Sequence, residues 1–449
     1  MKAAELSEQG ELRPANPSMA GARRRFVSEA SWVLLGQAIG AIGSVAGVRI
    51  LTQVLSPASF GELALAMTAT TLALQVLLGP LATTTLRFFA PAQEARQMRS
   101  FLEAVRDLLA GAAGLITVLG TVVLVCVVAI SGWQWFVLAG SALAFALLSG
   151  TSSVLDGMQN AARQRTVVAW HDGCAPWLRA GLAVILIHAL SRATSGVAMA
   201  GYALASACVL CSQYFFFRTR IRSLAAGDRE GAADRDRWIR DILVYGSPFA
   251  LWGVFTWAQM ASDRWALGVL VSTHEVGLYA AVYQLGFYPL VMLSQVLTQF
   301  AAPVLFRRAG DASDPDRVRA SRIANERLLL AVLGSTVLIT IVSALLHRWI
   351  ALLLLAPEYR SASHFFPWMT LAGGLFATGQ VAALGFMTAN RVRSMTAPKI
   401  ITALVGVALN LAGAFLYGVA GVVGAGVITA AIYCGWLILL AAQNRSDGN

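Results

Sequence analysis

Charged residues are scarce in this sequence, and long polar stretches are almost absent. Of the 449 residues only 13% are charged, whereas 57% are apolar; soluble domains carry about 25% charged residues. This balance excludes an ordinary soluble globule, and lipid is the expected solvent. No Asp, Glu, Lys or Arg occurs between Asp107 and Asp156 or between Lys399 and Arg445. Each gap can cross a bilayer twice, because one crossing needs about 20 residues.

Residues that build metal, redox and catalytic sites are also few. The five cysteines lie in apolar segments without zinc spacing, and the Cys208 and Cys211 pair has no redox fold beside it. The five histidines are scattered. The sequence has no G-x-x-x-x-G-K-[ST] loop, no H-E-x-x-H and no G-x-S-x-G motif. We therefore expect no metal site, no cofactor and no enzymatic activity, and ATP-driven pumping by this chain alone is excluded.

The apolar runs predict about twelve membrane-spanning helices, each near 20 residues long. The fold class expected is therefore an all-α integral membrane protein. In the first half the spans are placed at 31–54, 61–84, 107–130, 134–156, 174–190 and 196–217. In the second half they are placed at 243–270, 277–304, 328–346, 365–388, 396–416 and 421–441.

Positive charge sets the expected orientation. The net charge is +11, but the arginines fall in short segments between apolar runs, so they do not predict a nucleic-acid partner. Lysine and arginine are retained in cytoplasmic loops. With a cytoplasmic amino terminus, only Arg192, Arg348 and Arg360 fall in external segments, so both termini are expected in the cytoplasm.

Two internal matches predict a duplicated architecture. The segment SPASFGELA at 56–64 aligns with STHEVGLYA at 272–280, and a G-x-x-x-x-x-R-x-R pattern occurs at 157–165 and again at 385–393. Each copy occupies the same place in its half, as in transporters built from parallel repeats. The expected domains are a cytoplasmic tail (1–30), a six-helix bundle (31–217), a cytoplasmic linker (218–242), a second six-helix bundle (243–441) and a tail (442–449).

A few charged residues lie within or at the ends of the apolar spans. A central Arg or Asp costs about 2.5 to 3.5 kcal/mol on insertion scales, so such residues usually face a wet cavity or a partner. They are candidate substrate-binding residues in a chain expected to have no catalytic residues. The candidates are Arg49, Arg87, Asp156, Arg179, Asp263 and Arg264.

Arg49 and Arg264 occupy nearly equivalent places in the two halves. One interpretation is a pair of cations that flank a cavity between the halves and bind an anionic head group, with Asp263 adjusting Arg264. The alternative is that each side chain reaches the outer interface or forms a structural pair.

Three further charges lie toward the cytoplasmic side of the spans. Arg87 could receive a phosphate group at the inner leaflet, because the guanidinium fork matches phosphate oxygens; otherwise it is a positive-inside anchor. Asp156 and Arg179 are expected to close the fourth and fifth spans, where they could pair with each other structurally.

Three stretches carry a resemblance to a known family: RILTQVLSPASFGELALA at 49–66, YGSPFALWGVFTWAQMASDRWALGVLVSTHEVGLYAAVYQL at 245–285 and APEYRSASHFFPWMTLAGG at 356–374. They resemble the Wzx-type oligosaccharide flippases of polysaccharide biosynthesis, within the multidrug/oligosaccharidyl-lipid/polysaccharide (MOP) exporters. The resemblance implies a MATE-like fold of two six-helix bundles in the bacterial inner membrane. It also implies transport of an undecaprenyl-pyrophosphate-linked oligosaccharide to the outer leaflet for exopolysaccharide, capsule or O-antigen assembly. Expected partners are this lipid-linked oligosaccharide, membrane lipids, and a glycan polymerase and export machinery.

Other functions remain open at this point. A cation-coupled multidrug exporter needs a carboxylate inside the membrane; the first span has none, and Asp263 is the only deep candidate. A lipid II flippase typically carries two extra spans. A membrane glycosyltransferase or polymerase would present an acid or base on a sizeable external loop, which the sequence lacks.

Overall fold

The computed structural model describes residues 19–224, 232–310, 314–389 and 392–446, and every regular element in them is helical. The first half contains α1 (Met19–Val54), α2 (Pro57–Ala73), η1 (Leu74–Leu78), α3 (Gly79–Glu94), α4 (Met98–Ser131), η2 (Trp133–Trp135), α5 (Phe136–Ala161), α6 (Arg165–Leu190) and α7 (Ser195–Leu224). The second half contains α8 (Ala232–Leu270), α9 (Thr273–Val282), η3 (Tyr283–Phe287), α10 (Tyr288–Ala309), α11 (Pro315–Leu354), η4 (Pro357–Phe365), α12 (Phe366–Thr388), η5 (Val392–Met395) and α13 (Thr396–Ser446).

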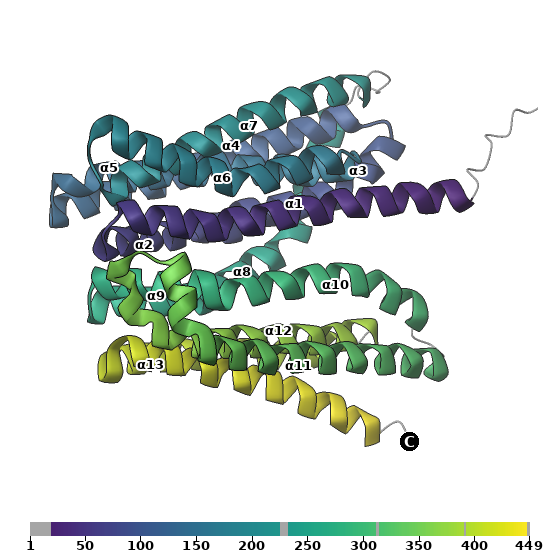
Figure 1. Cartoon of the computed structure of the whole chain (residues 1–449). Coiled ribbons are helices and arrows are strands. Elements are labelled where there is room, and N and C mark those ends of the chain that lie inside the picture. The colour runs from purple at the N-terminus through teal and green to yellow at the C-terminus, as the bar shows by residue number, and fades with distance from the viewer. Residues whose placement is uncertain (1–18, 225–231, 311–313, 390–391, 447–449) are drawn as a thin grey trace, which may run out of the picture.

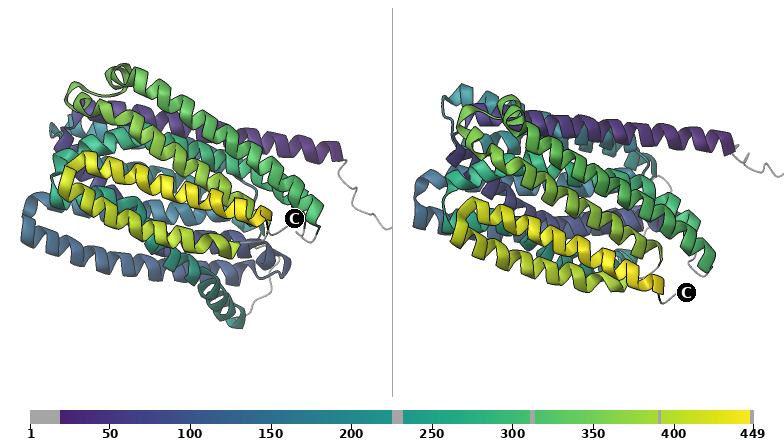
Figure 2. Two further views of the ribbon diagram at one scale, coloured as in Figure 1. Left: turned by 90° about the horizontal axis from the view of Figure 1, so that it is seen from below. Right: turned by 60° about the horizontal axis from the view of Figure 1, so that its bottom comes forward.

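The expected all-α membrane fold is confirmed. Ten helical stretches in the described residues are long and apolar enough to cross a membrane. The last two expected spans are the arms of α13, which turns at Gly418 (φ 57°, ψ −134°); Figure 2 shows these arms side by side. The expected span at 243–270 lies in α8. This helix is not among the ten, because its many polar and aromatic side chains lower its mean hydropathy. The count of twelve therefore stays a prediction.

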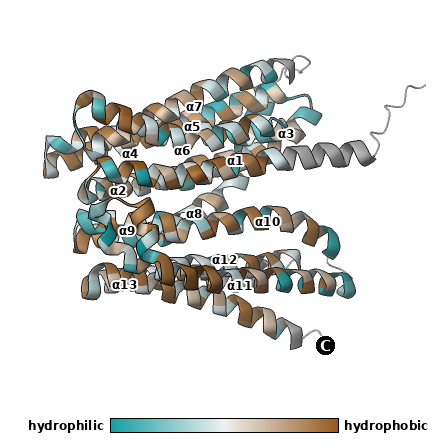
Figure 3. Ribbon diagram, viewed as in Figure 1, coloured by the Kyte–Doolittle hydropathy of each residue, from teal (hydrophilic) through white to brown (hydrophobic). Residues whose placement is uncertain are grey.

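Helices of each half lie together (Figure 1). In the first half α6 packs on α1 and α7, and α5 packs on α7; in the second half α12 packs on α10, α11 and α13. Helix α8 contacts α3 and α4 of the first half as well as α13. Hydrophobic residues run along the helices, and hydrophilic ones gather at several helix ends (Figure 3).

The expected tails and linker are partly described. Helix α7 continues to Leu224 and α8 begins at Ala232, so helices enter the expected linker (218–242) from both sides. Its residues 225–231 lie outside the described residues, as do 1–18 of the expected amino-terminal tail and 447–449 of the carboxy-terminal tail. Helix α1 begins at Met19, within the expected tail.

The two copies of the first repeat contact each other. Ser56 caps α2 by accepting a hydrogen bond from the Ser59 amide, and Ser272 caps α9 by accepting one from the Glu275 amide. Helices α2 and α9 then pack together so closely that a Cβ atom added to Gly61 would lie 2.8 Å from the Gly277 nitrogen. Glycine is needed at this glycine crossing (Gly61 and Gly277) because the backbones themselves are in contact.

Each half also contains a short π-helical segment beside a proline. Segment η1 ends at Leu78 and is followed by Gly79 and Pro80, while η3 ends at Phe287 and is followed by Tyr288 and Pro289. A proline within a helix lacks the amide hydrogen and collides with the carbonyl four residues earlier, which here lies inside the π segment. Such bulges bend helices and frequently mark functional sites.

Candidate functional site

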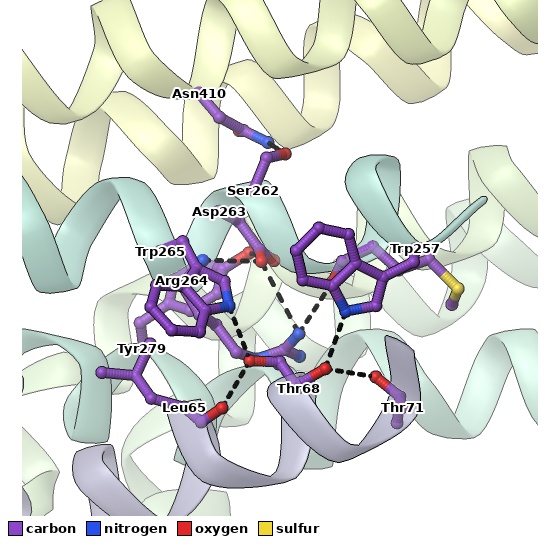
Figure 4. A network of polar contacts seen from close by, with 11 residues as sticks. Leu65, Thr68, Thr71, Trp257, Ser262, Asp263, Arg264, Trp265, Tyr279 and Asn410 are labelled. Atoms are coloured by element: carbon purple, nitrogen blue, oxygen red, sulfur yellow. Dashed lines mark hydrogen bonds and ion pairs between the residues drawn. The ribbon is translucent and has the colours of Figure 1, made fainter. Parts of the chain in front are cut away.

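Asp263 and Arg264 form a buried, internally satisfied ion pair in α8 (Figure 4). Each side chain is 10% exposed. Asp263 accepts hydrogen bonds from the Tyr279 hydroxyl and the Arg264 amide, both at 2.7 Å, and lies 3.6 Å from an Arg264 guanidinium nitrogen. Arg264 donates to the Met260 carbonyl at 2.9 Å and lies 4.1 Å from the centre of the Tyr283 ring. Because each charge has partners, the pair can remain ionised in an apolar bundle.

Two tryptophans of α8 fasten this region to α2 of the other half. Trp257 donates to the carbonyl of Thr68 at 2.7 Å, and Trp265 donates to the hydroxyl of Thr68 at 2.9 Å. The same hydroxyl donates to the Leu65 carbonyl, so Thr68 both accepts and donates (Figure 4). These bonds hold α8 against α2 close to the ion pair, because Trp265 directly follows Arg264 in the sequence.

A small cavity lies beside the ion pair in the second half. Asp263 lines it together with Tyr279, Tyr283 and Phe287, and Asn410 and Thr429 of α13. Its volume is about 80 Å³, which holds no more than a few water molecules. In this conformation the second-half cavity is too small for a sugar.

A larger cavity, the first-half cavity, lies among α2, η1, α5, α6 and α7. Its volume is about 460 Å³, within the usual range of ligand pockets. Eleven of the eighteen residues that line it carry polar side chains, although the surrounding helices are apolar. They are Thr71, Gln75, Ser149, Ser152, Ser153, Asp156, His171, Asp172, Arg179, Ser206 and Gln213.

A chain of hydrogen bonds fixes Asp156 in the wall of the first-half cavity. The side-chain amide nitrogen of Gln213 donates to Asp156 at 2.6 Å, and the side-chain amide oxygen of Gln213 accepts from the Ser152 hydroxyl. Gln159 donates to the backbone carbonyl of Gln213 at 3.3 Å. Gln213 of α7 thus holds the Asp156 side chain in place, and Ser152 and Gln159 of α5 hold Gln213.

Arg179 lies in the same cavity, and its position differs from the expected one. It stands in the middle of α6 rather than at a helix end, because α6 begins at Arg165 and not at the expected residue 174. Its guanidinium lies 5.1 Å from the centre of the Phe145 ring. It interacts electrostatically with Asp172, and no ion pair with Asp156 is formed among the described residues.

Asp172 and His171 are site residues that the sequence did not reveal. Both fall in the segment 157–173, which was expected to be a loop, but the early start of α6 places them two turns inside the helix. The R-x-R repeat at Arg163 and Arg165 could have signalled this start, because Arg163 ends the preceding turn with a positive φ of 62°.

Arg49 and Arg87 line neither cavity. Arg49 donates to the Leu355 carbonyl at 2.8 Å and so caps the end of α11. Arg87 is exposed on α3. The structure places Asp156 and Arg179 in the wall of one cavity and pairs Asp263 with Arg264. It does not place Arg49 and Arg264 on one cavity. Binding of a substrate by any of the six residues stays a prediction.

Metal-ligand geometry is not found in the described residues, where no group of three or more His, Cys, Asp and Glu side chains could hold a metal ion. All five cysteines are free.

Comparison with known proteins identifies both a family and a fold. The family model described as "Polysaccharide biosynthesis protein" matches residues 26–309. A search of the curated proteins found no match.

Solved structures share the fold over nearly the whole chain. An inward-facing multidrug resistance MATE family transporter of the MOP superfamily superposes with a TM-score of 0.65 at 14% identity, covering 92% of this chain and 99% of that one. The lipid II flippase MurJ in an inward closed conformation gives 0.66 at 13% identity, covering 92% and 87%. A mutant of the Vibrio cholerae MATE transporter VcmN gives 0.57 at 15% identity, covering 97% and 99%. The MATE-like fold is confirmed.

Proposed function

The chain belongs to the family of polysaccharide biosynthesis proteins, and from this premise we propose that it is a lipid-linked oligosaccharide flippase. It moves an undecaprenyl-pyrophosphate-linked oligosaccharide from the inner to the outer leaflet of the bacterial inner membrane. The product supplies exopolysaccharide, capsule or O-antigen assembly. The protein transports its substrate without making or breaking bonds, and a glycan polymerase and export machinery act after it.

The observation that carries this proposal is the polar first-half cavity inside apolar helices. Each sugar hydroxyl moved from water into hydrocarbon without a partner costs several kcal/mol, so an oligosaccharide head group meets a barrier of tens of kcal/mol. Hydroxyl, amide and carboxylate side chains such as Ser153, Gln75 and Asp156 line the cavity. Such groups replace water for the sugars while the prenyl chain stays in lipid.

The contacts between the halves support alternating access. At the end of the molecule where α2 and α9 begin, the halves meet at the glycine crossing. Tyr359 there donates to the Leu55 carbonyl at 2.8 Å and Arg49 to that of Leu355. From the distribution of basic residues we expect this end to lie outside, and with that orientation the protein is closed toward the outer leaflet.

Arg179 is the proposed contact for the pyrophosphate. It is half-buried, lines the first-half cavity, and its Nε atom has no hydrogen-bond partner among the described residues. Arginine's fork suits phosphate oxygens. Arg264 is already engaged by Asp263, Met260 and Tyr283, so it holds the bundle in shape.

A second candidate is a cation-coupled multidrug exporter. The observation that favours it is the pair of carboxylates, Asp156 and Asp172, in the first-half cavity, because a cationic drug would need such partners. Lipid II transport is a variant of the proposed function, since that substrate also carries a prenyl pyrophosphate.

The test is deletion of the gene in its host, followed by measurement of prenyl-linked oligosaccharides on the cytoplasmic leaflet. We expect accumulation that a wild-type copy reverses and an Arg179→Gln copy does not. Arg319→Gln is the matched control, because Arg319 is exposed on α11 and lines neither cavity.

The two possible outcomes distinguish a flippase from another kind of transporter. Accumulation that the wild type and Arg319→Gln reverse, and Arg179→Gln does not, establishes flipping through the first-half cavity. Intact surface polysaccharide with no accumulation would overturn the proposal and direct attention to drug efflux.

A further inference from the structure

Two arginines, one from each half, share a single acceptor at the end of the molecule where α2 and α9 begin. Arg49 of α1 donates to the Leu355 carbonyl at 2.8 Å, and Arg360 of η4 donates to the same oxygen at 3.3 Å. Two guanidinium nitrogens bonded to one oxygen lie within about 6 Å of each other, a separation at which like charges act strongly on each other. We call these two residues the outer arginine pair (Arg49 and Arg360).

Carboxylates do not neutralise the outer arginine pair in the part of the chain that the structure describes, where no ion pair includes either member. Of the carboxylates at this end, Glu62 accepts from Ser195 at 2.6 Å, and Glu275 lies 3.7 Å from His274. Glu358 is exposed on η4. The end of α11 supplies about half a negative charge, which is less than the two positive charges that meet there.

Both guanidiniums keep donors for a ligand. A guanidinium has several N–H groups in a planar fork. Within the described residues Arg49 donates one hydrogen bond, and Arg360 donates two, the second to the Leu352 carbonyl at 3.4 Å. Both side chains are half-buried, and charge-assisted hydrogen bonds are stronger in such surroundings than in water. Two forks that converge in this way suit the oxygens of a phosphate or diphosphate group.

We propose that the outer arginine pair binds the phosphate or diphosphate group of a lipid at the outer leaflet. The identity of this lipid as the delivered substrate rests on the proposed function. Binding of the anion does not, because it is measurable without transport.

Occupation of this site bears on the conformation of the protein. The site is complete only while the two halves are together at this end, because Arg49 belongs to α1 and Arg360 to η4. A ligand favours the conformation that it binds better, so a bound anion stabilises the closed outer end. Abundant delivered lipid would therefore keep more of the protein closed on that side and slow further export.

The test measures thermal unfolding of the purified full-length protein with two probes. One probe is inorganic pyrophosphate, and the other is undecaprenyl phosphate in phosphatidylcholine nanodiscs. All proteins carry Arg179→Gln, which removes the proposed contact in the first-half cavity. Arg49→Gln and Arg360→Gln are compared with Arg348→Gln, the matched control, because Arg348 is exposed on α11 and is also expected outside.

A second readout follows the closed outer end directly. Leu55 is 2% exposed, and its carbonyl accepts from Tyr359 of the other half. In a version without the five native cysteines, a Leu55→Cys side chain should react with a maleimide only when this end opens. We expect the probe that raises Tm to slow this reaction.

The supporting result is a rise in Tm that Arg348→Gln keeps and each variant of the pair weakens. Loss of one charge-assisted contact should raise the half-maximal amount of probe by about tenfold or more. If Arg49→Gln does not fold, Arg49→Lys replaces it, since it keeps the charge and loses the fork. An effect of undecaprenyl phosphate identifies a lipid head group as the ligand, and an effect of pyrophosphate alone identifies a free anion.

Three results overturn the inference: no rise in Tm with either probe, a rise that persists in both variants of the pair, or labelling of Leu55→Cys that the active probe leaves unchanged or accelerates. The arginines would then only cap α11. Failure here is separate from failure of the proposed function, because accumulation of prenyl-linked oligosaccharides in the deletion strain would still establish a flippase.

Discussion

At the scale of single residues, the membrane-embedded charges divide into two kinds. Asp263 and Arg264 satisfy each other with Tyr279, Met260 and Tyr283 around them, which is typical of a structural pair. The Nε atom of Arg179 has no hydrogen-bond partner in the described residues, which is typical of a group that awaits a ligand. The sequence supplied both kinds as candidates but could not separate them, because partners such as Tyr279 are fixed only by packing.

The structural pair gives the first prediction. Asp263→Asn should lower the free energy of unfolding by about 3 to 5 kcal/mol, because Arg264 would remain buried without a counter-charge. The measurement is thermal or denaturant unfolding of the purified protein. The double variant Asp263→Asn with Arg264→Met should recover much of the loss, because no buried charge remains. Equal stability of the single and double variants would contradict the assignment.

At the scale of helices, glycine and proline positions determine how the two halves meet and bend. The glycine crossing joins α2 to α9, and Pro80 and Pro289 each accompany a π-helical segment that lines a cavity. The repeat at 56–64 and 272–280 was evident from the sequence, but its direct self-contact was not. A pairwise match shows that two segments are alike and contains no information on whether they touch.

Gly61→Ala tests the crossing. The added Cβ would collide with the Thr273 carbonyl, and overpacking of this kind costs about 1 to 3 kcal/mol. We expect a lower Tm and less surface polysaccharide. The matched control is Gly111→Ala, where a Cβ meets nothing within 4 Å; this change should be neutral or stabilise α4 by up to about 1 kcal/mol. Identical behaviour of the two variants would refute a tight crossing.

Pro80→Ala tests the bend in the second span. Alanine restores the missing amide hydrogen and removes the clash that accompanies η1, so the helix can straighten. We expect export of polysaccharide to fall while the protein stays folded by its Tm. Pro248→Ala is the control, because Pro248 also lies inside a helix, α8, where no π segment accompanies it. Normal export in Pro80→Ala would show that the bulge is dispensable.

At the scale of the whole molecule, the lengths of the apolar runs predicted the membrane fold well. They predicted the ends of the individual helices less well. The runs located the helices because a bilayer admits little else. The fifth span was expected to begin at 174, whereas α6 begins at Arg165, so Asp172 was not recognised as a cavity residue. The start of α6 contains polar cavity residues and therefore has no continuous apolar run. The same effect hides α8 from a hydropathy criterion.

Orientation is the prediction at this scale. In a version without the five native cysteines, single cysteines replacing Trp133, Arg192 and Tyr417 should react with an impermeant maleimide applied to intact spheroplasts. Cysteines replacing Arg96, Arg163 and Arg308, at the opposite helix ends, should react only after the membrane is opened. Lysine and arginine retention on the cytoplasmic side is the physical reason. The reverse labelling pattern would invert the proposed direction of closure.

The presence of a π-helical segment in each half also bears on how the duplicated chain arose. A π-bulge is an α-helix with one extra residue accommodated in a turn, and both halves carry one, each followed two residues later by a proline. The helix before the bulge has 17 residues in the first half and 10 in the second, a difference of about two turns. The simplest ancestry is a single half that already had its bulge before it was duplicated.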